Sequence, residues 1–300
     1  MLRPLAPTLE RGLAAQRPLP GVADLRASLA RLQEQAVTGL RVNRASDDPQ
    51  AYAQARRFEA EAGRLEQYGR AVQAARLWAD ETALALDAMT TLAGEAVLAG
   101  TRAANETFSE ADREAMASRV EALAEQLVAR LNARVGDEYV FGGNRTDAPP
   151  FDAAGAPTGD LSGRRVRAIG PETRLAVNVP GTDVHEAPGV GSIPEAFAAL
   201  AAALRSGERA PLQQAIAGME RVQAHYAETA GRYGETAARL TDAAYVLDDA
   251  AVLVARRRSE AEDADMYTVI AEMQRAQTQL EIALRTAADA QQRTLLDYLR

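Results

Sequence analysis

The sequence predicts a mainly α-helical protein, an elongated antiparallel helical rod formed by both chain ends, with a small β-rich insertion at the tip. Apolar residues make up 47% of the 300 residues but aromatic residues only 5%, which favours closely packed helices over a thick aromatic core. Two long parts of the chain carry apolar residues seven positions apart, the spacing of helices that pack along a narrow seam. Residues 137–191 are instead rich in glycine, proline and aspartate, which indicates the insertion.

The composition also limits the function. The net charge of −8 at pH 7 provides no electrostatic footprint for nucleic acid. The chain has no cysteine, which excludes disulfides, thiolate metal sites and a cysteine nucleophile. The first 21 residues lack a long apolar run and are interrupted by Pro4, Pro7, Pro18 and Pro20, so we expect neither a cleavable secretory signal nor a membrane span there.

The segment from about Asp47 to Asn105 is predicted to be one long helix. It contains no proline after Pro49, and apolar residues follow the a and d positions of a heptad. The two rows are Phe58, Leu65, Val72, Ala79, Leu86 and Ala93, and, three positions beyond members of that row, Tyr68, Ala75, Met89 and Ala96. Because several of these residues are alanine, the partner helix must approach closely.

A second helix is predicted from Ser109 to about Val135. Ser109 with an acid three residues later is typical of a helix N-cap. The apolar face of this helix consists of Met116, Val120, Leu123, Leu127 and Leu131. The connection from the first helix is short, which predicts an antiparallel hairpin.

Within the insertion, the runs Arg164–Ile169 and Arg174–Val179 alternate in polarity around a turn-like spacer, Gly170–Thr173. This pattern predicts a β-hairpin or a small β-rich domain at one end of the rod.

Helices are predicted to resume at Pro194 and, after a break near Gly207–Pro211, to continue to the C-terminus. Leu240, Leu247, Val254 and Ala261 form one heptad row; Met266, Met273, Leu280 and Ala287 form the next, with Val269, Ala276, Ala283 and Ala290 three positions beyond. Ala261 and Met266 are five residues apart, and this shift marks a discontinuity in the seam. We therefore expect a joint near Asp263–Asp265, where the acidic run Ser259–Asp265 could cap a new helix.

The stretch GLRVNRASDDPQ, Gly39 to Gln50, concentrates charge and is either a site for a metal, phosphate or nucleic acid or a joint between helices. Gly39 can adopt the left-handed conformation that ends a helix over Ala23–Thr38. Ser46, Asp47 or Asp48 can accept the free N–H groups of the next helix, and Pro49 suits its first turn. The acids lack the alternation and the glycine of a calcium loop. We therefore interpret the stretch as a joint, in which Arg41 and Arg44 are candidates for pairing with acids on a neighbour.

No residue type or motif indicates catalysis. His185 and His225 belong to no metal-binding motif and are interpreted as surface or satisfied histidines. Glycine-rich nucleotide loops and Gly-x-Ser-x-Gly are absent, and the run Arg256–Arg258 is followed directly by acids, which favours a solvated helix face. A carboxylate pair for acid–base chemistry stays open, but no pair stands out. We assign no catalytic, cofactor-binding or metal-binding residue.

Four stretches, in the same order, resemble the bacterial flagellin superfamily. They are Leu32–Ala55, which contains the Ser-Asp-Asp-Pro joint; the helix start Ser109–Val120; DEYVFGGNRTDAPPF, Asp137–Phe151; and the tail Asp263–Arg300 with its Leu-Leu-Asp-Tyr-Leu ending. The last two favour the members that form the hook–filament junction over filament flagellin. Residues 1–20 match poorly, because Pro18 and Pro20 would break the family's N-terminal helix. They are a divergent arm, an extension or the product of a wrongly chosen start codon.

The resemblance implies a flagellin-like rod with three parts. Residues 1–45 and 265–300 would form a terminal coiled-coil assembly domain that orders on assembly, residues 46–136 and 192–264 a helical rod domain, and residues 137–191 the small β-rich insertion. The connector between the first two would be Gly39, Arg41, Val42, Arg44, Ser46, Asp47, Asp48 and Pro49. The assembly seam would be Met266, Val269, Ile270, Met273, Leu280, Leu284, Leu295, Leu296 and Leu299.

The resemblance also implies a non-enzymatic structural role in the bacterial flagellum, without a cofactor. The expected partners are copies of the chain itself, an adjoining hook-associated protein on the hook side, flagellin on the filament side and a cytoplasmic export chaperone at the C-terminal helix, with neither nucleic acid nor membrane. The expected location is extracellular, at the hook–filament junction, after export by the flagellar type III route without a cleaved signal. The alternatives are filament flagellin itself and, more remotely, a cytoplasmic helical-bundle enzyme or coiled-coil scaffold.

Overall fold

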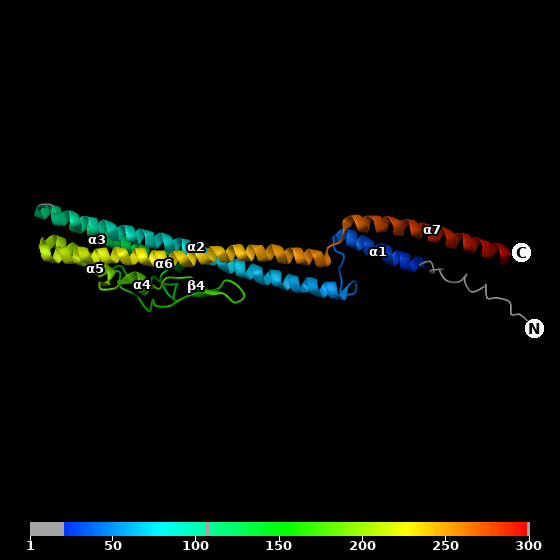
Figure 1. Ribbon diagram of the computed structural model, residues 1–300, viewed down its shortest axis with the longest axis horizontal. Helices are drawn as coiled ribbons and strands as arrows, with labels where there is room; N and C mark the ends of the chain where they lie inside the picture. Colours follow the sequence, from blue (N-terminus) through cyan, green and yellow to red (C-terminus); the bar gives the residue numbers. More distant parts are fainter. Residues whose placement is uncertain (1–20, 106–107, 299–300) are drawn as a thin grey trace, which may run out of the picture. The chain divides into compact units, whose positions relative to one another are not determined.

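The structure is a computed structural model that describes residues 21–105 and 108–298, the last ten as helical backbone only. These residues are mainly helical, as predicted (Figure 1). The helices are α1 (Val22–Thr38), α2 (Pro49–Asn105), α3 (Glu110–Leu131), α4 (Gly181–His185), α5 (Ile193–Ser206), α6 (Arg209–Glu262) and α7 (Met266–Tyr298). The strands are β1 (Arg134–Val135), β2 (Glu138–Tyr139), β3 (Val166–Ala168), β4 (Arg174–Ala176), β5 (Glu186–Ala187) and β6 (Gly191–Ser192).

The chain divides into two compact units. The terminal unit combines Met1–Glu61 with Val254–Arg300, and the central unit is Ala62–Leu253. Both boundaries fall inside the helices α2 and α6. The division into three domains inferred from the sequence stays a proposal.

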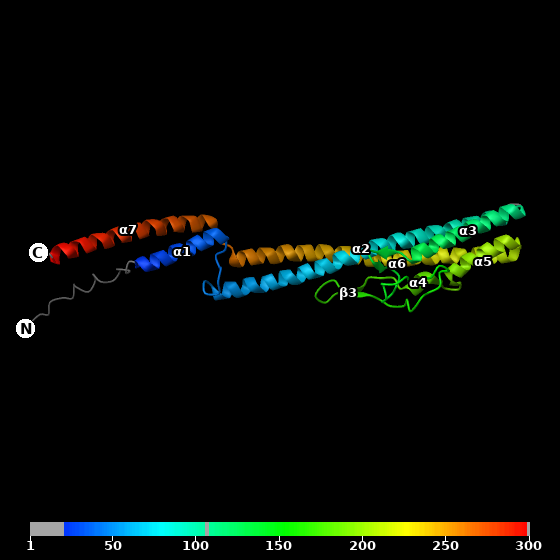
Figure 2. The same ribbon diagram turned by 180° about the vertical axis from the view of Figure 1, so that it is seen from behind.

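In the terminal unit, α1 and α7 pack against each other in opposite directions, and both views draw them side by side (Figures 1 and 2). Among the described side chains of this contact, Leu32, Val269 and Ala276 are buried, with Leu29 and Met273 packed around them.

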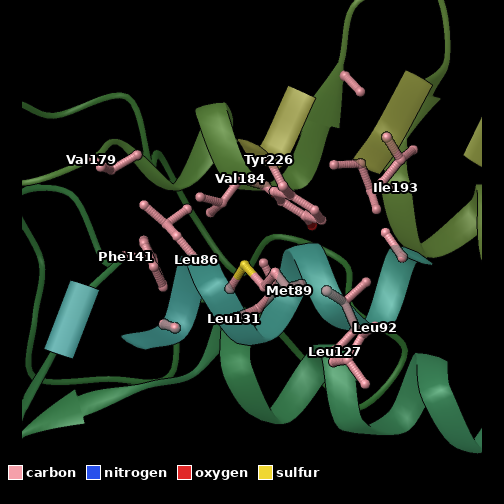
Figure 3. Close-up of a cluster of buried hydrophobic side chains, with 14 of the residues drawn as sticks. Leu86, Met89, Leu92, Leu127, Leu131, Phe141, Val179, Val184, Ile193 and Tyr226 are labelled. Carbon is pink, nitrogen blue, oxygen red and sulfur yellow. The ribbon is translucent and has the colours of Figure 1, made fainter. Parts of the chain in front are cut away.

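In the central unit, α2 and α6 run antiparallel. A Cβ atom added at Gly94 would meet Gln223, and one added at Gly100 would meet Ile216, so the numbering rises along α2 as it falls along α6. The helices α3 and α5 pack together beside this pair. The core has leucine, methionine and alanine from α2 and α3 on one side and Ile193 and Tyr226 on the other (Figure 3). The most apolar part of α2 has the length and composition of a membrane span, but its fully buried residues belong to this core.

The helix from Ser109 ends earlier than predicted. Ser109 caps it as expected, accepting a hydrogen bond from the N–H of Asp112. The helix stops at Leu131, not near Val135, because β1 and β2 form a tight hairpin around Gly136, whose φ is 59°. The side chain of Asn132 also leaves the helix to donate to and accept from the backbone of Phe151.

The predicted hairpin is confirmed, since β3 pairs antiparallel with β4 and Arg167 lies opposite Leu175. Its predicted place at the tip is wrong. The hydroxyls of Tyr226 and Tyr233, inside α6, donate to the carbonyl oxygens of Val184 and Val177, at 2.8 and 2.7 Å. These bonds fix the insertion to the side of the long helices. At the opposite end of α3 and α5, Gly207, which ends α5, lies beside Arg113 near the start of α3.

Candidate functional site: the joint between the long helices

The outgoing side of the joint starts at Gly39, which ends α1 as predicted. Gly39 has φ of 71°, in the left-handed region, and its N–H donates to the carbonyl oxygen of Gln35. No atom lies within 4 Å of a Cβ atom added there, so the backbone conformation is what requires glycine.

The two acids of the Ser-Asp-Asp-Pro motif have separate tasks. Asp47 closes the loop, because its Oδ2 accepts the N–H groups of Asn43 and Arg44 at 3.1 and 2.9 Å. Asp48 caps α2, because its Oδ1 accepts the N–H groups of Gln50 and Ala51 at 3.2 and 3.0 Å. Of the three cap candidates, the structure therefore selects Asp48, and Pro49 occupies the first turn as predicted.

Asp48 also pairs with Arg41, one of the two arginines expected to pair with acids. Its Oδ2 lies 3.2 Å from Nη1 of Arg41. The pKa of the Asp48 carboxyl is lowered, chiefly by the N–H of Ala51 and then by Arg41. A carboxylate that is occupied in this way keeps few lone pairs for a metal. In the part of the chain that the structure describes, no group of three or more potential ligands could hold a metal ion.

The return side of the joint lies directly against the outgoing side. The predicted break is confirmed: α6 ends at Glu262 and α7 begins at Met266. Asp265 caps α7, since its Oδ1 accepts the N–H of Tyr267 and its Oδ2 accepts the hydroxyl of Thr268. These bonds, first that of the Thr268 hydroxyl and then that of the Tyr267 N–H, lower the pKa of Asp265.

Backbone hydrogen bonds tie the two sides together. The N–H groups of Arg41 and Val42 donate to the carbonyl oxygen of Glu262 at 2.7 and 3.3 Å, and the N–H of Ala264 donates to the carbonyl oxygen of Gly39 at 2.9 Å. Leu40 and Asp263 form an isolated antiparallel bridge between them. The joint is therefore a short pair of antiparallel segments held by backbone hydrogen bonds. The sequence predicted both segments but not the hydrogen bonds between them.

Side-chain contacts also stabilise the joint. Arg41 donates through Nη2 to the carbonyl oxygen of Ala261 at 2.9 Å, and Arg44 pairs with Glu34 of α1 at 2.8 Å. Both guanidinium groups thus bind acceptors of their own chain, and a contact with another subunit stays a prediction. Val42 and Glu262 are buried, and Nε of Arg258 lies 2.6 Å from the Glu262 carboxylate. The four-residue spacing of Arg258 and Glu262 on one helix was the signal that could have identified this pair.

The predicted seam residues of α7 fall into three groups. Val269 is buried against α1 and Met273 packs beside it. Leu280 is half-buried, while Met266, Ile270 and Leu284 are exposed. The side chains of Leu295 and Leu296, and Leu299 altogether, lie outside the described residues, as do residues 1–20. The apolar face of α7 is therefore only partly covered by α1.

The two histidines lie in the central unit. His185 is buried and stacks on Phe151, with ring centroids 5.5 Å apart. Nε2 of His225 lies 2.7 Å from the carbonyl oxygen of Asp183. Both rings are packed or hydrogen-bonded, which agrees with their interpretation as satisfied histidines.

Two family profiles match the chain. The profile of the bacterial flagellin N-terminal helical region matches residues 14–146, and that of the C-terminal helical region matches residues 215–299. Together they cover more than two thirds of the sequence. The matches include both sides of the joint, α1 and α7.

The chain is also similar to individual flagellar proteins. The chain is 32% identical over 141 residues to the flagellar hook-associated protein 3 of Salmonella typhimurium, a match that spans 45% of this chain and 43% of that protein. Among solved structures, a chain described as a flagellar hook-associated protein of Vibrio parahaemolyticus has a TM-score of 0.66 at 16% identity and covers 72% of this chain and 100% of its own. The flagellar junction protein FlgL of Legionella pneumophila has a TM-score of 0.58 at 16% identity, over 70% and 100%. At these identities the structural likeness establishes the fold.

Proposed function

Since this chain belongs to the bacterial flagellin family, we propose that it is a structural component of the flagellum, a junction protein that links hook to filament through coiled-coil packing with copies of itself. The observation that carries the proposal is the 32% identity, over 141 residues, to a protein named flagellar hook-associated protein 3. Because the match spans 43% of that relative, its role is carried over here as a proposal.

The packing of the terminal unit supports the proposal that α7 becomes ordered when copies of the chain assemble. In a single chain, Ile270, Ile282 and Leu284 are exposed by 43%, 59% and 42%. Among the described side chains, those buried in the cluster between α1 and α7 are Leu32, Val269 and Ala276. A long helix with so little packing is marginal in water, so contacts with other copies must supply the rest. On this basis we assign residues 1–45 and 265–300 to a terminal assembly domain, with Gly39–Pro49 as its connector to the rod.

The same proposal names partners and location. Copies of the chain would contact an adjoining hook-associated protein on one side and flagellin on the other, and an export chaperone would hold the C-terminal helix beforehand. The protein would act outside the cell at the hook–filament junction, after type III export. No step of this role requires catalysis.

Deletion of the coding sequence tests the proposal. Hooks should remain on the cells, while filaments fail to attach and flagellin leaks into the medium. Electron microscopy of the cells and gel analysis of the culture supernatant measure both. Attached filaments in the deletion strain would overturn the proposal.

Two alternatives give different results. If the chain is filament flagellin, it will be the dominant band of sheared filaments, whereas a junction protein is a minor component. If it is a cytoplasmic bundle enzyme or scaffold, the purified monomer will be fully ordered. Hydrogen exchange distinguishes this case, because our proposal requires rapid exchange in residues 266–300 of the monomer.

A further inference from the structure

One face of α2 in the central unit carries a row of exposed leucines. Leu77, Leu84 and Leu98 are exposed by 64%, 65% and 48%. They are separated by seven and fourteen residues, which places them on one side of the helix. The opposite side of α2 supplies the core residues Leu86 and Met89, so the leucine row takes no part in the fold of the described chain. Heptad spacing of large apolar side chains indicates packing against another helix.

The central unit also has a groove large enough for leucine side chains. It runs between α5 and α6 with a volume of about 670 Å³. Its walls are formed by small residues: Ala196, Ala199 and Ala203 of α5, and Pro211, Ala215 and Gly218 of α6. Small side chains let the backbone of a further helix approach closely, and the volume suits the leucine side chains that such a helix would insert.

Charges around Leu98 and at the ends of the groove are complementary as well. Asp87 and Arg102 share the face of the leucine row and lie on either side of Leu98. Glu208 and Arg221 line the groove near its two ends. At 1.5 Å per residue, Asp87 and Arg102 are about 22 Å apart along the helix, and Glu208 and Arg221 about 20 Å. The wall has one more charged residue, Glu195.

The order of the charges fixes the orientation of the occupant. Because α2 and α6 are antiparallel, Arg102 and Glu208 lie toward one end of the unit, and Asp87 and Arg221 lie farther from that end. A second copy that points the same way therefore brings Arg102 to Glu208 and Asp87 to Arg221 with one displacement. Two leucine rows packed against each other in the same direction would instead place Asp87 against Asp87 and Arg102 against Arg102, which is repulsive.

We propose that the groove between α5 and α6 receives Leu98, with the face of α2 from Asp87 to Arg102, from a second copy of this chain. The two surfaces differ, so the contact is head-to-tail, and a pair of copies keeps one free α2 face and one free groove. Such a contact continues into a ring or a helical array in which all copies point the same way. This inference rests on the proposed function for its biological meaning, since it names a surface through which copies of a junction protein would pack.

Cysteine cross-linking tests the contact without background, because the chain contains no cysteine. Strains that express a mixture of Leu98→Cys and Ala215→Cys full-length chains are treated with a short bis-maleimide, and isolated hook–filament structures are analysed on gels. A dimer band is expected for the mixture and not for either variant alone. The matched control pairs Ala215→Cys with Val252→Cys, an exposed position of α6 outside the groove.

Each outcome is informative. If the chain is present in the isolated structures but the 98–215 pair cross-links no better than the control, the docking proposal is overturned and the proposed function stands. If the chain is absent from hook–filament structures, the proposed function fails, and the same pair in concentrated purified protein then decides the docking contact.

Charge reversal provides a second test. Asp87→Arg or Arg221→Asp alone should lower the cross-link yield several-fold, and a mixture of the two variants should restore it. Circular dichroism checks that each variant is folded. Loss of yield without recovery in the mixture would overturn the proposed pairing of these charges.

Discussion

Tyr226 lies fully buried in α6, where its hydroxyl donates to the carbonyl oxygen of Val184 at 2.8 Å. Replacing Tyr226 with phenylalanine keeps the ring in the core but removes the donor. The carbonyl of Val184 then loses its hydrogen bond in an environment from which water is excluded. An unsatisfied buried acceptor costs about 1–3 kcal/mol, so we expect the central unit to lose that much stability.

The single tryptophan provides the assay, because Trp78 is buried in the same unit, beneath the guanidinium of Arg165 at 4.4 Å. Urea unfolding followed by tryptophan fluorescence should show a midpoint lower by about 0.3–1.5 M, taking a slope of about 2–3 kcal/mol per molar. The matched control is Tyr245→Phe on the same helix. Its side chain is 68% exposed, and we expect a change within about 0.5 kcal/mol.

If Tyr226→Phe lowers the midpoint no more than Tyr245→Phe does, the reasoning is refuted. The Val184 carbonyl would then have another partner, and the insertion would be held by side-chain packing alone. A change in the slope with an unchanged midpoint would also count against it, because the slope reports the surface exposed on unfolding.

Three further predictions concern the buried tyrosines, Gly39 and Leu280. Burial raises the pKa of Tyr226 and raises that of Tyr233 to about 12. The contribution of the two neutral hydroxyls to stability is therefore fully present below the unfolded-state pKa near 10 and is lost as pH rises through the folded-state pKa values. Alkaline titration followed by Trp78 fluorescence measures this loss, and an unchanged transition in the double variant Tyr226→Phe, Tyr233→Phe would contradict it. Gly39→Ala should weaken filament attachment, because the left-handed backbone costs alanine about 1–2 kcal/mol, and Gly39→Asn should weaken it less; equal attachment in wild type and Gly39→Ala would show that the joint relaxes. Leu280→Asp should leave the central unit folded by Trp78 fluorescence but abolish assembly, and normal motility in that strain would contradict the assigned seam.

Several places where helices begin or end could be predicted from the sequence, because single side chains mark them. Gly39 supplies a left-handed residue, Asp48 and Asp265 supply cap acceptors, and Ser109 supplies a hydroxyl. These signals act within a few residues, so the local sequence contains all the required information. The early end of α3 escaped prediction because it depends on Asn132 bonding to Phe151, nineteen positions away. The place of the insertion likewise depends on Tyr226 and Tyr233, whose spacing within α6 resembles that of ordinary core residues.

The pairing of the two segments at the joint could not be predicted, because it is formed by backbone groups. The carbonyl oxygens of Gly39 and Glu262 accept the bonds that hold it, and any residue offers the same carbonyl. These bonds join the last residues before α7 to the first residues after α1. The two helices are thus tied at one end independently of the apolar contact between them.

This tie has a consequence for assembly. An interaction that orders α7 near Met266 also fixes the ends of Gly39–Val42, and therefore reduces the conformational freedom that α1 must lose. Ordering of the two terminal helices should accordingly be cooperative, even though few side chains are buried between them. A substitution confined to α1, such as Leu32→Asp, should then raise hydrogen exchange in the first turns of α7 in assembled structures, with Val37→Asp, at an exposed position of α1, as the matched control. Unchanged exchange in α7 would mean that the backbone bonds at the joint do not couple the two helices.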